Sequence, residues 1–255
     1  MERSGSFFRR DCKGSSLSKM IIKRMIDTSL IDWEGKIVST LYVSSCNFRC
    51  PFCYNYDLVL NPNNFSNISS KEIDSSLLER KKFIDGICMS GGEPTLYPDL
   101  PTYFKGIKEK GFLIKLDTNG TNPKLLEELL NDELIDYIAM DIKSSLNFSD
   151  YARAAGIKDK ILLERVKDSI RLIMSSQIEY EFRTTVVPLL HTEKTIIEIA
   201  KYISGAKKYV LQNFSPSEST LEPSFQKMKP YSSEKLVELS EKAKEYVPNC
   251  YYRLS

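Results

Sequence analysis

Three cysteines lie in one short segment of the chain, Cys46, Cys50 and Cys53, at the spacing C-x-x-x-C-x-x-C. Thiolates that converge on one loop are soft ligands, suited to an iron–sulfur cluster or to zinc. A 4Fe–4S cube needs one ligand per iron, so three thiolates leave one iron with an open coordination position. A metal with an open position is able to bind and activate a substrate. A structural zinc that takes its fourth ligand from elsewhere in the chain is the competing interpretation.

Two glycines and a glutamate follow the next predicted strand, in the stretch Gly91-Gly92-Glu93-Pro94. Glycines at a strand end let another molecule approach the backbone closely, because no Cβ stands in the way. The carboxylate of Glu93 is able to accept hydrogen bonds from an ammonium group. A Gly-Gly turn at a strand end, taken alone, is more often a simple tight turn with no bound ligand. Because it comes one strand after the three-cysteine segment, it favours a bound cofactor.

Strands and helices are predicted to alternate from Ile37 onward, in the order typical of βα units and a parallel sheet. The helix after the cysteine segment is expected to begin near Ser69, with Glu72 at capping-box spacing. Six βα units fit an α/β fold of the partial TIM-like barrel type, (βα)6, better than a closed eight-stranded barrel. The predicted strands span residues 37–43, 83–89, 112–116, 137–140, 180–187 and 209–212.

Polar residues gather where these predicted strands end. In parallel α/β barrels the carboxyl ends of the strands carry the active site, because the loops there point into one mouth. Loops are polar in any case, so each stretch taken alone is weak evidence. The recurrence at several strand ends predicts a site at this face. The stretches are the cysteine segment, Gly91-Gly92-Glu93, Asp117-Thr118-Asn119, Asp141 with Lys143, and Gln212-Asn213.

The composition limits the function classes. A net charge of +2 gives no case for nucleic acid as the main partner. The six cysteines show no regular pairing, and His191 is the only histidine, which disfavours a disulfide framework, histidine-based metal sites and Ser–His–Asp hydrolysis. No apolar run is long enough to span a membrane, and the N-terminus lacks the apolar core of a signal peptide. We therefore expect a protein of the reducing cytoplasm.

One domain is expected over residues 25–255, with a core at about 37–214 and a C-terminal loop and helix at 215–255. Residues 1–24 are basic and polar and are expected to form a disordered extension. Within this range the first nineteen residues are read as disordered or as preceding the true start, for which Met20 is a candidate.

The sequence resembles the radical S-adenosylmethionine (SAM) superfamily over about Met25 to Phe214. The resemblance rests on the three cysteines, Phe52 and Gly91-Gly92-Glu93-Pro94. Within the superfamily it is similar to the activating enzymes of glycyl-radical enzymes, such as anaerobic ribonucleotide reductase and pyruvate formate-lyase. The stretches that carry this second similarity are Asp27–Lys36, Leu116–Gly120, Ala139–Lys143 and Phe182–Pro188.

The resemblance implies a 4Fe–4S cluster held by Cys46, Cys50 and Cys53, with SAM bound at the open iron. An electron from the reduced cluster would cleave SAM to methionine and a 5′-deoxyadenosyl radical, which would take a hydrogen atom from a neighbouring group. The amino group of SAM would be bound by the backbone of Gly91 and Gly92 together with Glu93. Phe52 would offer an apolar surface to the adenine, or serve as a packing residue.

Further roles are implied for polar residues at the strand ends. Asp117, Thr118 and Asp141 match positions that hold a monovalent cation near the SAM carboxylate in pyruvate formate-lyase activating enzymes. Hard oxygen ligands suit such a cation, but a hydrogen-bonded network with Lys143 is the alternative. Arg183 is expected to pair with the SAM carboxylate, or else to form a structural ion pair.

The implied activity is hydrogen abstraction from a glycine of a partner glycyl-radical enzyme. Many relatives follow the third cysteine with His-Asn, whereas this chain has Tyr54-Asn55, which bears on the choice of partner. The chain lacks a ferredoxin-like cysteine insert, so one cluster is expected, with electrons from a ferredoxin- or flavodoxin-like protein. Two alternatives stay open: a radical SAM enzyme acting on a small molecule, such as a deazapurine carboxylate synthase, and a non-catalytic metal-binding module.

Overall fold

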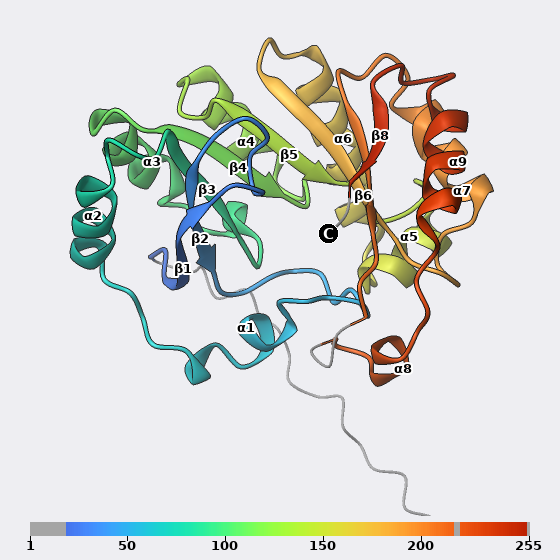
Figure 1. The fold of residues 1–255 in the computed structure, drawn as a ribbon, viewed down its shortest axis with the longest axis horizontal. Coiled ribbons are helices and arrows are strands. Elements are labelled where there is room, and N and C mark those ends of the chain that lie inside the picture. Colours follow the sequence, from blue (N-terminus) through green and yellow to red (C-terminus); the bar gives the residue numbers. More distant parts are fainter. Residues whose placement is uncertain (1–18, 217–219, 254–255) are drawn as a thin grey trace, which may run out of the picture.

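Eight strands form one sheet in the order of the chain, curved around a lumen with helices on its outer side (Figure 1). The computed structural model describes residues 19–216 and 220–253. The first strand pairs antiparallel with the second, and every later pairing is parallel. The strands are β1 (Ile22–Ser29), β2 (Val38–Val43), β3 (Gly86–Gly91), β4 (Leu113–Thr118), β5 (Tyr137–Asp141), β6 (Glu179–Val186), β7 (Tyr209–Asn213) and β8 (Cys250–Arg253).

The helices cover the outer face of the sheet or flank its open mouth (Figure 1). Ser69 caps α2 as expected, since its side chain accepts from the Glu72 amide while Glu72 accepts from the Ser69 amide at 2.8 Å. The helices are α1 (Tyr56–Leu60), α2 (Ser70–Glu79), α3 (Leu100–Glu109), α4 (Pro123–Asn131), α5 (Phe148–Ala155), α6 (Lys160–Ser175), α7 (Glu193–Tyr202), α8 (Pro223–Gln226) and α9 (Ser233–Ala243).

The six predicted strands correspond to β2–β7, which confirms the α/β fold with a partial barrel. Strand β3 begins at Gly86, whereas the predicted strand began at Phe83. Phe83 lies in the preceding turn, with 74% of its surface exposed. Two edge strands were not predicted. Strand β1 starts at Ile22, inside the range expected to be an extension, and β8 lies in the range expected to hold only a loop and a helix. Residues 1–18 lie outside the described residues.

Alternate residues of each strand face the helices or the lumen. In β4, Ile114 and Leu116 are fully buried in the main apolar core. Their neighbours Lys115 and Asp117 form an ion pair with an Nζ–Oδ1 distance of 2.7 Å, which places them together on the opposite, lumen-facing side. The lumen of this barrel is therefore lined by charged side chains rather than filled only with aliphatic ones.

The segment between β1 and β2 closes the lumen at the amino ends of the parallel strands. Trp33 packs there with Val38 and Cys88 and contacts the Tyr137 ring at a centroid distance of 5.7 Å. The lumen is accordingly left open toward the carboxyl ends of the strands. In the described parts of the chain, no helix has the length and apolar character needed to cross a membrane.

Candidate active site

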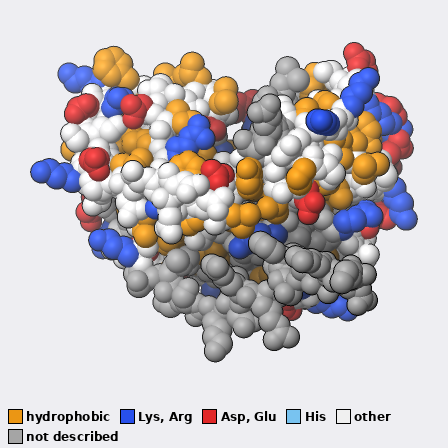
Figure 2. Space-filling model, turned by 90° about the horizontal axis from the view of Figure 1, so that it is seen from below, with side chains coloured by type: hydrophobic (Ala, Val, Ile, Leu, Met, Phe, Trp, Pro, Cys, Tyr) orange, Lys and Arg blue, Asp and Glu red, His pale blue; other side chains and the backbone are white. Residues whose placement is uncertain are grey.

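A cavity of about 370 Å³ lies at the carboxyl ends of the parallel strands, between the cysteine loop and β3–β7. Figure 2 views the molecule from this side and shows apolar side chains near the middle of the face, with charged side chains mostly toward its margins. Every residue predicted from the sequence to act in the site lines this one cavity. These residues are Cys46, Cys50, Phe52, Cys53, Gly91, Gly92, Glu93, Asp117, Thr118, Asp141, Lys143 and Arg183.

The three cysteines follow β2 directly, and their thiols are free. Cys50 is buried, whereas Cys46 and Cys53 are partly exposed toward the cavity. Two N–H groups point at the Cys46 sulfur: the Phe48 amide at 3.4 Å and the Asn119 side-chain amide at 3.8 Å. Burial raises the pKa of the Cys50 thiol to about 12, and it also raises the pKa of Cys46 and Cys53.

The donor set of this wall fits an iron–sulfur cluster. It consists of three unpaired thiols on one loop, with N–H donors available to a sulfur that carries negative charge. Within residues 19–216 and 220–253, no three His, Cys, Asp or Glu side chains are grouped to hold one metal ion.

Gly91 and Gly92 pack against the chain's own backbone. A Cβ on Gly92 would lie 1.8 Å from the Ser45 carbonyl oxygen, and a Cβ on Gly91 would lie 2.4 Å from the Val43 carbonyl oxygen. Two hydrogen bonds fix this approach, from the Gly92 amide to Val43 O at 2.9 Å and from the Glu93 amide to Ser45 O at 2.8 Å. We expected a cofactor to approach the backbone of these two glycines. In the structure, the segment of residues 43–45, which leads into the cysteine loop, makes this close approach.

Glu93 has contacts that differ from its expected role as acceptor for the SAM amino group. Its side chain is fully buried, and its two oxygens accept four hydrogen bonds from within the protein. Oε1 accepts from the Thr95 amide and hydroxyl and from the Thr118 hydroxyl, and Oε2 accepts from the Asn119 amide at 2.6 Å. Glu93 thus joins the end of β3 to the end of β4.

The aromatic residues of the cysteine loop have separate surroundings. Phe52 is 4% exposed and packs edge-on against the His191 ring at a centroid distance of 6.4 Å, which agrees with the packing alternative, and it is also one of the residues that line the cavity. Tyr54 stacks on Phe214 and accepts a hydrogen bond from the Ser215 amide at 2.6 Å. The residue that replaces the usual histidine therefore attaches the segment after β7 to the cysteine loop.

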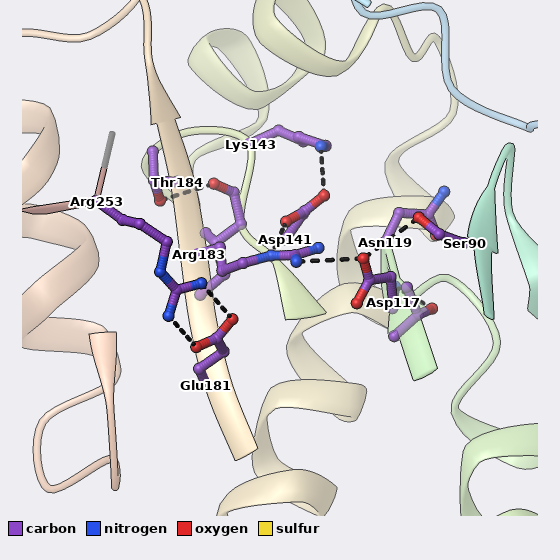
Figure 3. A network of polar contacts seen from close by, with 12 residues as sticks. Ser90, Asp117, Asn119, Asp141, Lys143, Glu181, Arg183, Thr184 and Arg253 are labelled. Atoms are coloured by element: carbon purple, nitrogen blue, oxygen red, sulfur yellow. Dashed lines mark hydrogen bonds and ion pairs between the residues drawn. The ribbon is translucent and has the colours of Figure 1, made fainter. Parts of the chain in front are cut away.

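Arg183 connects the ends of two neighbouring strands (Figure 3). Its Nε donates to Asp141 Oδ1 at 2.9 Å, and its Nη1 donates to Asp117 Oδ2 at 3.2 Å. The second oxygen of each carboxylate pairs with a lysine: Asp117 with Lys115, and Asp141 with Lys143 at 2.9 Å. Although burial alone would raise the pKa of both carboxyls, the nearby cations hold each pKa below its usual range.

This network does not fit a bare monovalent cation. Each oxygen of Asp117 and Asp141 already faces a positively charged donor, and the Thr118 hydroxyl donates to Glu93. Lys115, Lys143 and Arg183 thus occupy the carboxylate oxygens that a further cation would need as ligands. The network found with Lys143 and Arg183 agrees with the alternative that the sequence left open.

Three charged residues of the lumen were missed by sequence reasoning. Lys115 is 2% exposed and donates to Asp117 and to the Asp32 carbonyl at 2.5 Å. Glu181 is 2% exposed and pairs with Arg253 of β8. For Lys115 the available signal was a charge between apolar residues of a strand, and for Glu181 it was a charge near the start of a strand. Arg253 gave no signal because β8 was not predicted.

The chain is similar to proteins of one superfamily. Residues 41–203 match the model of the Radical SAM superfamily. A protein of Methanocaldococcus jannaschii, named as a candidate glycyl-radical enzyme activating enzyme, is 33% identical over 92% of this chain and 96% of its own length. The 7-carboxy-7-deazaguanine synthase of Methanothermobacter thermautotrophicus is 26% identical over 63% of this chain and 67% of its own length.

The fold is shared with a solved structure, Streptococcus suis SuiB bound to S-adenosylmethionine, with a TM-score of 0.62 and 17% identity. The likeness covers 83% of this chain and 48% of the SuiB chain, so this chain corresponds to about half of that protein. The resemblance drawn from the cysteine and glycine motifs is confirmed, and a non-catalytic module is set aside because members of this superfamily are enzymes. The chain belongs to the radical SAM superfamily of enzymes.

Proposed function

We propose that this protein is a glycyl-radical-enzyme activating enzyme, which removes a hydrogen atom from a glycine Cα of a partner enzyme. The observation that carries the proposal is the 33% identity, over nearly the whole length of both chains, to a relative named for this activity. The expected partner is an anaerobic ribonucleotide reductase or an enzyme of the pyruvate formate-lyase type. A reducing cytoplasm, in which the thiols stay unpaired, is the expected compartment.

The two walls of the cavity have different chemical characters that suit this reaction. One wall carries the three thiols, which would hold a 4Fe–4S cluster, and the other carries the charged network around Arg183. When bound, the cluster and SAM supply a 5′-deoxyadenosyl radical by one-electron cleavage of a C–S bond. The electron would come from a ferredoxin- or flavodoxin-like protein.

The chain's own residues would bind and orient SAM. Arg183 and Lys143 would pair with the SAM carboxylate, because both cationic side chains line the cavity, where their ion pairs with Asp117 and Asp141 hold them. The backbone at Gly91 and Gly92 would bind the amino group in place of the fully engaged Glu93 carboxylate. Because Trp33, Val38 and Cys88 close the lumen at the amino ends of the strands, a glycine-bearing loop would enter from the carboxyl ends.

The test uses anaerobically purified protein with a reconstituted cluster, SAM, a one-electron reductant and the candidate partner. We expect 5′-deoxyadenosine together with a glycyl-radical electron paramagnetic resonance signal that requires the partner. A partner carrying glycine deuterated at Cα should transfer deuterium to 5′-deoxyadenosine, and a partner with that glycine changed to alanine should give no radical. If SAM is cleaved with every candidate partner but no glycyl radical appears, the proposal is wrong.

A second candidate is a radical SAM enzyme with a small-molecule substrate. The similarity to a 7-carboxy-7-deazaguanine synthase favours it, at lower identity and over a smaller share of both chains. The same experiment separates the two, because a small-molecule enzyme would move deuterium from its substrate to 5′-deoxyadenosine without any partner protein.

A further inference from the structure

Arg253, whose side chain is 25% exposed, forms an ion pair with the buried Glu181 beside the Arg183 network (Figure 3). Nη1 of Arg253 lies 3.3 Å from Glu181 Oε1, and Nη2 lies 3.1 Å from Oε2, so the guanidinium faces both carboxylate oxygens. The Tyr137 hydroxyl donates to the same carboxylate at 3.3 Å. Glu181 is 2% exposed, and neither it nor Arg253 is among the residues that line the cavity.

Glu181 and Arg183 lie on the same strand, β6, with one residue between them. Side chains at i and i+2 of a strand share a face and lie about 7 Å apart at their Cα atoms. An unpaired Glu181 would therefore be a third buried anion close to Arg183, in addition to Asp117 and Asp141. Because Arg253 neutralises Glu181, the Arg183 side chain is free to contact Asp117 and Asp141 instead.

We propose that Arg253 is a positioning residue for SAM binding. By pairing with Glu181, it keeps Arg183 at the cavity, where Arg183 joins Asp117 to Asp141 and presents its guanidinium to SAM. The last strand of the sheet thereby sets the charge of a cavity that it does not line. The inference rests on SAM binding by this superfamily and is independent of the identity of the hydrogen donor.

Removal of the guanidinium tests this directly. In Arg253→Met, the buried Glu181 loses its cation, and Arg183 is expected to turn toward it and away from the aspartates. The readout is the equilibrium dissociation constant for SAM, measured without partner on cluster-reconstituted protein kept oxidised, so that SAM is not cleaved. We expect the affinity to fall about tenfold or more, the equivalent of about 1.4 kcal/mol.

The double variant Arg253→Met/Glu181→Gln separates charge balance from a merely structural role of Arg253. It removes the carboxylate that would attract Arg183, so SAM affinity should return to within about threefold of wild type. Arg253 also lies 3.5 Å from Glu34, and a structural role through that contact would leave the double variant as weak as the single one. The control Glu34→Gln, which leaves Glu181 paired, should bind SAM like wild type.

Two results would overturn the proposal: unchanged SAM affinity in Arg253→Met, or a double variant that folds but binds as weakly as the single one. If Arg253→Met does not fold, the double variant alone tests the proposal. The proposal requires the double variant to fold and to bind SAM, and failure of either would contradict it. Because no partner protein is present, these outcomes do not depend on whether the partner is a glycyl-radical enzyme.

Discussion

The Tyr251 hydroxyl donates to Glu34 Oε2 at 2.8 Å, and this contact joins the two edges of the open sheet. Glu34 lies between β1 and β2, whereas Tyr251 is in β8 at the other edge. Lys208 approaches the same carboxylate at 3.2 Å. The hydrogen bond from Tyr251 and the nearby cations hold the pKa of Glu34 below its usual value. The partial barrel is thus closed by side chains at the amino ends of its parallel strands.

Loss of the contact between Tyr251 and Glu34 should lower the free energy of unfolding only slightly. The two substitutions should nevertheless have non-additive effects on that free energy. Because the Glu34 side chain is 60% exposed, Glu34→Gln is expected to lower the free energy of unfolding by about 1 kcal/mol or less, and by less at high salt. Tyr251→Phe should cost about 1 kcal/mol. Urea unfolding of both single variants and the double variant tests the pair, and fully additive losses would show that the two side chains are not coupled.

The strands that the sequence revealed are those with an apolar side packed under helices. Strands β2–β7 carry such residues at alternate positions, for example Ile114 and Leu116. Strand β1 was missed because it is an edge strand in which Lys23, Arg24 and Asp27 interrupt the apolar residues. Strand β8 was missed because its four residues are too few to show a period.

The members of the site were predictable from residue type and position at strand ends, but their partners were not. Glu93 accepts from Thr118 and Asn119 of the next strand's end, and Arg183 reaches two carboxylates that lie 42 and 66 residues away. Such contacts depend on strand order and on the lumen-facing register, which a single sequence does not specify. The sequence therefore predicted a place for Glu93 at the cofactor cavity but not its hydrogen bonds with Thr118 and Asn119.

The approach of Gly92 to the cysteine loop predicts that its replacement disrupts the cofactor site. In Gly92→Ala, the new Cβ would meet the Ser45 carbonyl oxygen at 1.8 Å, so the backbone that leads to Cys46 must move. We expect a loss of at least about 2 kcal/mol in unfolding free energy and a marked drop in bound iron after reconstitution. Iron per chain and urea unfolding are the measurements.

Gly106 offers a matched control for that substitution. It lies inside α3, where the nearest atom to an added Cβ is the Lys110 amine at 3.9 Å. Gly106→Ala should therefore raise the unfolding free energy by about 0.5 to 1 kcal/mol and leave iron content unchanged. Equal effects of the two alanines would contradict the assignment of a specific steric role to Gly92.

The cysteines should divide into two groups by their effect on iron binding. Cys46→Ala, Cys50→Ala and Cys53→Ala are each expected to abolish the cluster, because each removes one of the three available thiolates. Cys88→Ala should keep it and lose only about 1 kcal/mol of stability, since Cys88 is a fully buried residue of the lumen floor. Iron, sulfide and zinc per chain distinguish these outcomes, and tight zinc without sulfide in the wild type would contradict the cluster.

His191 holds the end of β5 against the loop that follows β6. Its Nδ1 accepts from the Val187 amide at 2.9 Å, so the proton is on Nε2, which lies 2.7 Å from the Lys143 carbonyl oxygen. Burial lowers the pKa of His191 to about 4. Asp150 is among the charged groups nearby, and a hydrogen bond from the Asn147 side chain holds its pKa below the usual value.

Stability should therefore fall as the pH is lowered from about 6.5 toward 4. The unfolded chain binds a proton at the histidine with a pKa of about 6.5, whereas the folded chain resists protonation until about pH 4. The stabilisation is thus complete above pH 6.5 and is lost on acidification, with a limiting slope of about 1.4 kcal/mol per pH unit. His191→Asn keeps an acceptor for the Val187 amide but does not titrate, so it should be less stable at pH 7 and lose less on acidification. Urea unfolding at half-unit pH steps compares the two proteins, and parallel curves between pH 4 and 6.5 would mean that His191 is not the group responsible.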